Sequence, residues 1–566
     1  MIELKNVSFS YADSAVATLE NLSVTIPTGS FVAIVGDNGA GKSTFCKLLN
    51  GIIPTFIDGE LSGEIRVQGV KVREKKPAVL AKTVGYVYQD FENQLLRPKV
   101  LDDASFSLLN MGEEAYEELT MTILEALDLD HLADEYVWQL SGGQKHLLAL
   151  AGVLVLSPEV LVLDEPIAQL DPYHAKKIYE QLAVLHRQGK TIIVIEHNTA
   201  FIGEYCDHVL FMKERNIRWF LPVKEALQRV EELTAGGIFP PQVTLLGHEL
   251  VKRGLQPAGT LPITIHEALP YLQPLEARIS RREKEVAQAE VPPLRQPVLN
   301  FQEVNLEYKK INDRPHPVIT QLNLTIHRGD RVAIIGNNGA GKSSLLKMTV
   351  GLLKPKRGEI RLKEQLIHRL KAEEISNVIG YVYQNPEGMF IEDSIEKDIA
   401  FSMRARGIKD YQTRTEMLLT QFDLLALRHR DGRLLSGGQM RRASLAIGVA
   451  LSPQILLLDE PTASLDMATR KRITSTLQAL SESIETVMIA THDMQLVAEW
   501  ATRIIVMNEG VILADGPREV IFQDTHLLER AGIVVPEIVQ LSQQLSGVIS
   551  YSVEEFVHQV EQGGRI

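Results

Sequence analysis

The strongest constraint on this chain is an internal repeat. The octapeptide GDNGAGKS at residues 36–43 recurs as GNNGAGKS at residues 336–343, 300 residues later. Further along, the offset is 295 residues: it holds for GYVYQ at 85–89 and 380–384, LSGGQ at 140–144 and 435–439, and LDEP at 163–166 and 458–461. Because order and spacing are duplicated together, the chain consists of two copies of one unit.

The repeat continues beyond these motifs. GGIFPPQV from residue 236 resembles AGIVVPEI from residue 531, so each copy has a core and a tail. Between the copies, residues 276–297 contain three prolines and mix five basic with four acidic residues, which predicts a solvated, semi-rigid linker. The predicted boundaries are 1–235 and 298–530 for the cores, 236–275 and 531–566 for the tails, and 276–297 for the linker.

Composition narrows the class of protein. The 566 residues include 59 Lys and Arg against 72 Asp and Glu, and a net charge of −13 disfavours a broad nucleic-acid-binding surface. The only cysteines, Cys46 and Cys206, cannot build a disulfide framework and are expected to be buried thiols. We expect no secretory signal, and the most apolar stretch, 147–156, is shorter than the roughly 20 residues of a spanning helix. Any membrane role is therefore expected to need a partner.

The pattern of apolar residues predicts an α/β fold. Uninterrupted apolar runs, VLVLD at 160–164 and TIIVI at 191–195, are typical of buried parallel strands. STFCKLLNG at 43–51 has the periodicity of a helix that ends at glycine. Between Gln89 and Leu140, segments such as EEAYEELTMTILEALDL at 113–129 are helical in pattern, which predicts a helical subdomain that interrupts the sheet.

Each octapeptide is a Walker A motif that follows an apolar strand. Its glycines let backbone N–H groups approach phosphate oxygens at the positive end of a helix. Lys42 and Lys342 supply a charge for the β- and γ-phosphates, and Ser43 and Ser343 a hydroxyl for Mg²⁺. The predicted ATP-binding residues are Gly36, Asp37, Asn38, Gly39, Ala40, Gly41, Lys42, Ser43 and Thr44, and Gly336, Asn337, Asn338, Gly339, Ala340, Gly341, Lys342, Ser343 and Ser344.

The LDE sequences place two carboxylates at the end of a buried strand, where α/β sheets bind ligands. Asp164 and Asp459 suit Mg²⁺ binding. Glu165 and Glu460 are predicted as the catalytic carboxylates that polarise the attacking water.

LSGGQ opens an apolar helix in each copy, so that its amides and serine can face an anion. With this motif the whole chain resembles an ABC-type ATPase, specifically two nucleotide-binding domains fused in tandem. In that family the signature of one domain completes the ATP site of the other, which implies that the two halves form an intramolecular ATPase pair. The implied ATP-binding residues are Ser141, Gly142, Gly143, Gln144, Ser436, Gly437, Gly438 and Gln439.

The resemblance implies further roles by motif order. Gln89 and Gln384 match the glutamine that senses Mg²⁺, and His197 and His492 match the histidine that contacts the γ-phosphate. An aromatic residue that stacks on adenine is matched by Tyr11 and Tyr308, although such a residue can also be packing. The D-loops end at Asp171 and Asp466, with Gln169 where the second copy has Ser464. The implied cofactors are ATP and Mg²⁺.

The second copy reads QNPE at 384–387, similar to the energy-coupling-factor (ECF) type of transporter ATPase, whereas the first reads QDFENQ at 89–94 without the proline. That type implies an ATPase bound to the cytoplasmic side of the cell membrane that powers import of a vitamin, vitamin precursor or metal ion. The implied partners are a transmembrane coupling protein and a substrate-capture protein, with the two tails pairing and no nucleic acid bound.

Apolar residues just after the Q-loop glutamines are expected to dock a membrane-subunit helix, or else to pack the helical subdomain. They are Phe91, Leu95 and Leu96 in one copy and residues 389–391 in the other. The alternative function is a soluble tandem ABC protein that acts on ribosomes. Its hallmark would be a long basic arm between the domains, whereas the inter-copy segment is nearly charge-balanced.

Overall fold

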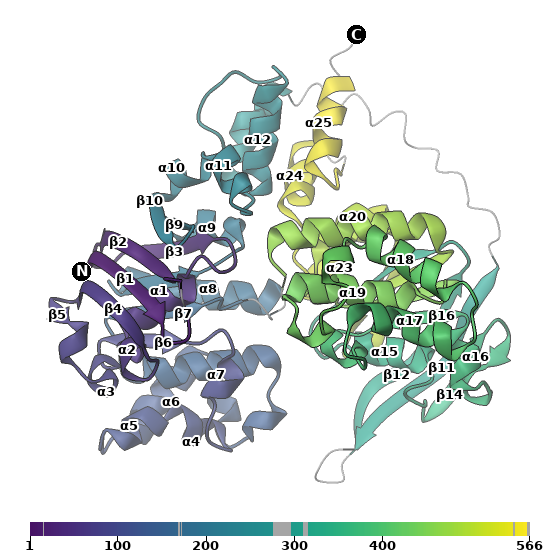
Figure 1. The fold of residues 1–566 in the computed structure, drawn as a ribbon, viewed down its shortest axis with the longest axis horizontal. Helices are drawn as coiled ribbons and strands as arrows, with labels where there is room; N and C mark the ends of the chain where they lie inside the picture. Colours follow the sequence, from purple (N-terminus) through teal and green to yellow (C-terminus); the bar gives the residue numbers. More distant parts are fainter. Residues whose placement is uncertain are drawn as a thin grey trace. The chain divides into compact units, whose positions relative to one another are not determined.

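The computed structural model describes residues 1–14, 16–167, 170, 172–275, 296–309, 315–463, 465–546 and 549–562. The chain divides into two compact units, Met1–Pro274 and Leu275–Ile566 (Figure 1). Most of the predicted linker, together with Gln169, Asp171 and Ser464 of the predicted D-loops, lies outside the described residues.

The first unit begins with a small antiparallel sheet of order β2-β1-β4-β5. Alternate residues of its first strand, among them Ile2 and Leu4, are buried, as expected for a sheet with one face on a core. Its strands are β1 (Ile2–Tyr11), β2 (Leu19–Ile26), β4 (Gly59–Val67) and β5 (Val70–Lys71).

The central sheet of the first unit has six strands in the order β10-β9-β3-β8-β7-β6, and only β10 runs antiparallel to its neighbour. Every residue of β3, β7 and β8 is buried, which explains their continuous apolar sequences. The strands are β3 (Phe31–Gly36), β6 (Val84–Val87), β7 (Val160–Asp164), β8 (Thr191–Ile195), β9 (His208–Lys213) and β10 (Asn216–Pro222).

Two cores cover the faces of this sheet. Phe31 and its alternate neighbours on β3 pack in one core with Tyr179 of α8 (Pro172–Arg187). Val32 packs in the other core with Phe45 of α1 (Lys42–Leu49) and with the antiparallel sheet. The phosphate loop between β3 and α1 is thus fixed at both ends by buried residues.

Helices follow where the sequence predicts them. The inserted helical subdomain contains α4 (Val100–Ala104), α5 (Phe106–Asn110), α6 (Tyr116–Ala126) and α7 (Gly142–Leu154). The tail of the unit contains α11 (Val230–Ala235), α12 (Gln242–Lys252) and α13 (Ile265–Leu272), after α10 (Val223–Leu227). Shorter helices are α2 (Ile52–Thr55), α3 (Pro77–Leu80) and α9 (Thr199–Tyr205).

The second unit repeats this architecture, with sheets of order β12-β11-β14-β15 and β16-β17-β18-β13-β19-β20. The strands are β11 (Pro297–Lys309), β12 (Pro315–His327), β13 (Arg331–Ile335), β14 (Arg357–Leu362), β15 (Gln365–Leu366), β16 (Ile379–Val382), β17 (Ile455–Asp459), β18 (Thr486–Ala490), β19 (Arg503–Asn508) and β20 (Val511–Pro517).

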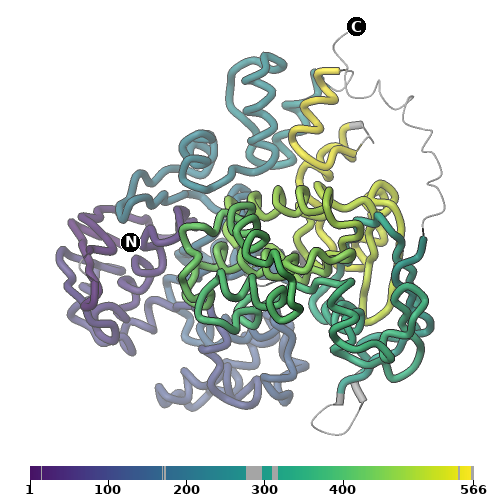
Figure 2. Tube along the Cα trace, turned by 45° about the vertical axis from the view of Figure 1, so that its right-hand side comes forward, coloured from purple at the N-terminus to yellow at the C-terminus, as the bar shows by residue number. Residues whose placement is uncertain are grey.

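The helices of the second unit are α15 (Lys342–Thr349), α16 (Ala372–Ser376), α17 (Ile395–Ala405), α18 (Tyr411–Gln421), α19 (Gly437–Val449), α20 (Met467–Ser483), α21 (Met494–Trp500), α22 (Arg518–Gln523), α23 (Thr525–Arg530), α24 (Glu537–Ser546) and α25 (Val553–Gln562). The last of these helices, α24 and α25, are in the yellow C-terminal part of the chain in Figure 2. The predicted class, α/β with an inserted helical subdomain, is confirmed. Among the described residues, no helix has the length and apolarity needed to span a membrane.

Candidate active sites

The first phosphate loop joins β3 to α1. Gly36 has φ +154°, and a Cβ on it would collide with the carbonyl oxygen of Met212, so this position requires glycine. The Nζ atom of Lys42 donates to the carbonyl oxygens of Gly36 (2.7 Å) and Asp37 (3.0 Å). The remaining predicted residues lie between the end of β3 and the first turn of α1: Asn38, Gly39, Ala40, Gly41, Ser43 and Thr44.

The second loop, between β13 and α15, has the same construction. Gly336 (φ +147°) faces the carbonyl of Met507, and Lys342 Nζ donates to the carbonyls of Gly336 (2.6 Å) and Asn337 (3.1 Å). Its other residues, Asn338, Gly339, Ala340, Gly341, Ser343 and Ser344, occupy equivalent places. Each loop therefore holds an ammonium group at a helix N-terminus, where an anionic phosphate would bind.

The predicted Mg²⁺ ligands lie at the ends of β7 and β17. In the second unit the Ser343 hydroxyl donates to Asp459 Oδ1 at 2.8 Å, so two oxygen ligands of the kind Mg²⁺ prefers are already together. Tyr381 also donates to Asp459 (3.2 Å), and Tyr86 donates to Asp164 (3.1 Å). Burial raises the pKa of both aspartates, a penalty on the charged form that a bound cation would relieve.

The first predicted catalytic carboxylate, Glu165, is held by two side chains. Gln89 Nε2 donates to its Oε2 at 2.8 Å, and His197 Nε2 lies 3.3 Å from its Oε1. Burial alone would raise the pKa of Glu165, but the hydrogen bonds and charges of its neighbours, His197 first, hold the pKa below its ordinary value. Its φ of +52° is uncommon for a residue with a side chain and is the kind of local strain found at functional sites.

The second carboxylate, Glu460, is held differently. Its Oε2 accepts from the Thr491 hydroxyl (3.1 Å) and from the backbone N–H of His492 (3.3 Å), and the Nδ1 atom of His492 lies 2.9 Å away. Burial opposes ionisation, yet the contacts with His492 lower the pKa of Glu460. The pKa of His492 is raised in turn, because the attraction of Glu460 outweighs the effect of burial. Within the described residues no hydrogen bond joins Gln384 to Glu460.

The signature motifs form helix N-termini, as predicted. Ser141 caps α7: its hydroxyl accepts from the N–H of Gln144 (3.3 Å), and its own N–H donates to the Gln144 side chain (2.9 Å). At α19 the N–H of Ser436 donates to the Gln439 side chain (3.2 Å). Gly142 and Gly437 follow the caps, and a Cβ on Gly143 or Gly438 would crowd the side chain that packs on each.

The two predicted adenine-binding tyrosines lie beside the helix that follows each phosphate loop. The Tyr11 hydroxyl is 2.8 Å from Thr44 Oγ1, and the Tyr308 hydroxyl is 3.0 Å from Ser344 Oγ. Tyr308 is 40% exposed.

Sequence reasoning missed several residues of these sites. Thr491 carried no signal, because threonine is common at strand ends. Arg441 is buried and donates to the backbone carbonyls of Tyr383 (2.9 Å) and Gln384 (2.8 Å), which fixes the second Q-loop. The first unit has His146 there, and burial lowers its pKa to about 4. Comparison of the two copies, position by position, was the available signal.

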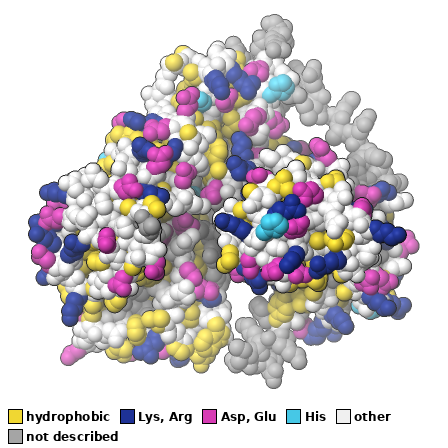
Figure 3. All heavy atoms as spheres, viewed as in Figure 1, with side chains coloured by type: hydrophobic (Ala, Val, Ile, Leu, Met, Phe, Trp, Pro, Cys, Tyr) yellow, Lys and Arg dark blue, Asp and Glu magenta, His cyan; other side chains and the backbone are white. Residues whose placement is uncertain are grey.

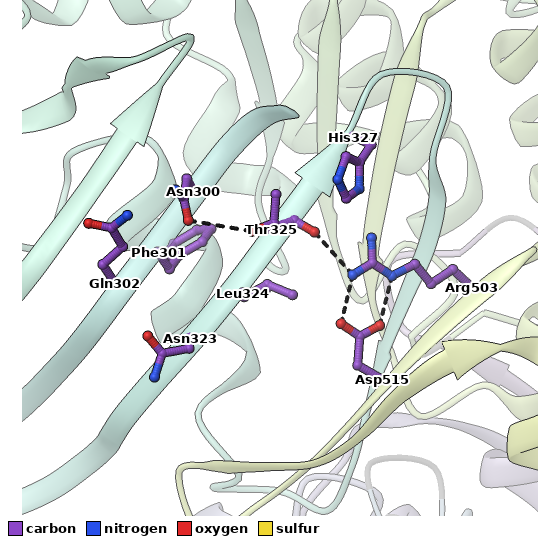
Figure 4. A pocket seen from close by; sticks show the side chains of 9 residues that line it. All are labelled: Asn300, Phe301, Gln302, Asn323, Leu324, Thr325, His327, Arg503 and Asp515. Carbon is purple, nitrogen blue, oxygen red and sulfur yellow. Dashed lines mark hydrogen bonds and ion pairs between the residues drawn. The ribbon is translucent and has the colours of Figure 1, made fainter. Parts of the chain in front are cut away.

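A pocket of about 550 Å³ lies on the second unit, apart from the phosphate loop (Figure 4). The Arg503 guanidinium in it donates twice to Asp515 (2.7 and 2.6 Å) and once to the carbonyl of Thr325 (3.0 Å). It thereby ties β19 to β20 and β12, which is a structural role. The lining residues are Asn300, Phe301, Gln302, Asn323, Leu324, Thr325, His327, Arg503 and Asp515.

Comparison with known proteins agrees with this geometry. The model of the ABC transporter family matches residues 19–168 and 319–463. A protein of Methanosarcina mazei is 31% identical over 554 residues, 96% of this chain and 94% of its own. One of Caldanaerobacter subterraneus subsp. tengcongensis is 32% identical over 570 residues, 98% of each. Both are named as ABC transporter ATP-binding proteins, and neither name gives a substrate.

Among solved structures, CbiO1 of Clostridium perfringens, described as part of the ABC transporter complex CbiONQ, is 28% identical. The match covers 42% of this chain and 94% of that one, with a TM-score of 0.37. The family model matches both units, and the relatives match nearly the whole length of the chain. The chain therefore belongs to the ABC transporter family, as an ATPase with two ATP- and Mg²⁺-dependent domains in tandem.

Proposed function

We propose that this ATPase is the energy-coupling subunit of an ECF-like importer. It would power uptake of a vitamin, vitamin precursor or metal ion through a separate transmembrane coupling protein and a substrate-capture protein, on the cytoplasmic face of the cell membrane. The QNPE sequence at 384–387 and the duplicated tails support this type. On the face shown in Figure 3, basic and acidic side chains are interspersed, which supports the expectation that nucleic acid is not a partner.

We propose further that hydrolysis occurs at two composite sites. In each, the phosphate loop, Q-loop glutamine, carboxylates and histidine of one unit combine with the signature of the other. The first site would comprise Lys42, Gln89, Asp164, Glu165 and His197 with Ser436 and Gly438; the second would comprise Lys342, Gln384, Asp459, Glu460 and His492 with Ser141 and Gly143. The support is that every catalytic element occurs once in each unit.

The observation that carries the transport proposal is a matched pair of exposed apolar side chains after the Q-loops. Leu96 is 64% exposed and Ile391 60% exposed, at equivalent places in the two copies. Phe91, by contrast, is buried and packs its ring 4.5 Å from that of His146, so it belongs to the helical subdomain. Leu95 also packs on the core. In the second copy Phe390 is buried and Met389 is half-buried. Leu96 and Ile391 are therefore the exposed residues of the predicted docking surface that would contact a membrane-subunit helix.

The test is uptake by cells that carry Leu96→Glu and Ile391→Glu. A charge at each contact should break co-purification with the membrane proteins in mild detergent and abolish uptake, while ATP hydrolysis by the isolated chain persists. Matched controls are Val79→Glu on α3 and Val520→Glu on α22, whose side chains are 53% and 59% exposed but lie on other helices. Full uptake and co-purification by the Leu96 and Ile391 variants would place the docking surface elsewhere, and recovery with ribosomes would favour the alternative function.

We also propose that the two tails, 236–275 and 531–566, contact each other and hold the halves together without ATP. Cys46 and Cys206 are buried, so new surface cysteines would react alone. Lys252→Cys and Glu554→Cys, on exposed positions of the two tails, should cross-link in the ATP-free chain. Absence of this cross-link both with and without ATP would refute the pairing.

A further inference from the structure

In both units the start of the tail packs against the phosphate loop. α11 ends at a turn whose Gly237 has φ +70°, and a Cβ placed on Gly237 would lie 2.8 Å from Oδ1 of Asp37. In the second unit, a Cβ on Gly532 (φ +64°) would lie 2.6 Å from Nδ2 of Asn337. The same turn of the tail therefore faces the same loop residue in both units.

This turn is held firmly on its other side. The Gly237 N–H donates to the carbonyl of Thr234 (3.0 Å), and the Ile238 N–H donates to the carbonyl of Leu233 (2.9 Å), which closes the helix around a left-handed residue. Ile238 is buried in the core. Gly532 and Ile533 make the equivalent bonds at the end of α23 (3.0 and 2.9 Å). A shift of Asp37 or Asn337 toward the tail is therefore opposed by a hydrogen-bonded turn.

The loop residue also contacts the active-site lysine. The carbonyl of Asp37 accepts from Lys42 Nζ at 3.0 Å, and that of Asn337 accepts from Lys342 Nζ at 3.1 Å. A phosphate that binds the ammonium group competes with this carbonyl for it. Binding of a phosphate at the lysine thus acts on the backbone of Asp37 or Asn337, and the side chain of the same residue faces the turn of the tail.

We propose that each tail responds to the nucleotide in its own domain through Asp37 or Asn337, and that the turn at Gly237 or Gly532 in return positions the phosphate loop. Gly237 and Gly532 are positioning residues in this scheme, and the linkage is reciprocal by thermodynamic necessity. The coupling lies within each unit and does not depend on what the protein transports. It would connect ATP occupancy to the segment that the proposed function assigns to holding the halves together.

The sharpest test compares Gly237→Ala with Gly254→Ala. Gly254 follows α12 with φ +69°, so both variants carry the same left-handed penalty, but nothing lies within 4 Å of a Cβ on Gly254. Binding of a fluorescent ATP analogue is measured in a Lys342→Ala background, which removes the phosphate-binding lysine of the second loop. We expect Gly237→Ala to weaken binding about fivefold relative to Gly254→Ala, with equal thermal midpoints.

The contact is isolated by a double-mutant cycle. Asp37→Ala removes the carboxylate that the new Cβ would meet, so Gly237→Ala should add no further loss in that background. The second unit offers the same comparison, with Gly532→Ala against Gly407→Ala, whose φ of +66° and open surroundings match. A purely structural effect of the methyl group would persist when Asp37 is removed.

Hydrogen exchange keeps the proposal falsifiable even where a variant does not fold. In the unmodified chain, Mg-ATP analogue should slow amide exchange in the turn at 236–238, and the Asp37→Ala chain with bound analogue should lose that protection. Unchanged exchange at the turn, or equal affinities for Gly237→Ala and Gly254→Ala, would overturn the coupling. Neither result would bear on the docking of membrane subunits.

Discussion

Thr491 is the residue whose predicted effect follows most directly from the geometry. Its hydroxyl donates to Oε2 of Glu460 at 3.1 Å, and both side chains are buried, at 0% and 5% exposure. Valine keeps the branched shape and removes this donor, together with the acceptor of the Asp493 N–H (3.0 Å). A hydrogen bond to a charged group contributes about 1.5–3 kcal/mol. If it orients the carboxylate toward the attacking water, Thr491→Val should lower kcat at the second site about 10- to 150-fold.

The assay is phosphate release by a chain that carries Glu165→Gln, so that the measured turnover comes from the second site. The matched control is Thr474→Val on α20: Thr474 is also buried, but its hydroxyl donates to the carbonyl of Arg470 on its own helix (3.1 Å) and not to a carboxylate of the described residues. The control should keep kcat within about twofold of its parent. If Thr491→Val does so as well, with an unchanged unfolding midpoint, Thr491 does not hold the carboxylate and the reasoning fails.

Three further predictions concern the carboxylates of the two units. Glu165→Gln, measured in a Glu460→Gln background, should cost about 100-fold or more in turnover at the first site; unchanged turnover would remove Glu165 as the catalytic carboxylate. His492→Ala removes the side chain that lowers the pKa of Glu460, so the effect of burial, which raises that pKa, is no longer opposed by it. The acid limb of the pH–rate profile of the second site should therefore move to higher pH, and an unchanged limb would contradict this. Tyr179→Phe removes the donor to Oε2 of buried Glu196 (2.9 Å) and should lower the free energy of unfolding by about 1–3 kcal/mol, checked by urea titration of the first unit's transition.

Much of the fold could be predicted because it depends on local patterns. The run at 160–164 is buried at every position, and the phosphate loops follow buried strands, as continuous apolar sequence before a glycine-rich turn indicates. The antiparallel sheet was not predicted. Its first strand alternates visibly, but its partners, β2 and β4, are selected by long-range packing that no local window contains.

At the sites, the motifs located the groups that are predicted to bind phosphate and to polarise the attacking water, but not the groups that hold those side chains in place. The contact of Gly237 with Asp37 joins positions far apart in the sequence, although the repeated glycine itself was visible. Tyr86 and Tyr381 were also visible, inside the repeated GYVYQ, yet their bonds to Asp164 and Asp459 depend on strand order. Repetition of a residue in both copies indicates that its position is constrained, but the contact that constrains it is known only from the folded structure.

Position 196, the counterpart of Thr491, shows why equal motifs do not make equal sites. Glu196 accepts from the backbone N–H groups of His197 (2.7 Å) and Asn198 (2.8 Å), and burial raises its pKa. It orders the backbone that carries the histidine and leaves Glu165 to be held by other side chains.

The two carboxylates therefore depend on different donors. Gln89 donates directly to Glu165, whereas the backbone of the equivalent Gln384 is fixed by Arg441 and a threonine hydroxyl holds Glu460. Motion of the first Q-loop would act on its carboxylate through one hydrogen bond, and motion of the second would not. A partner that moves both Q-loops should consequently change turnover at the first site more than at the second. Single-site turnover, measured with and without the proposed membrane subunits, gives that difference. Equal stimulation of the two sites would show that the Gln89 bond does not transmit the motion.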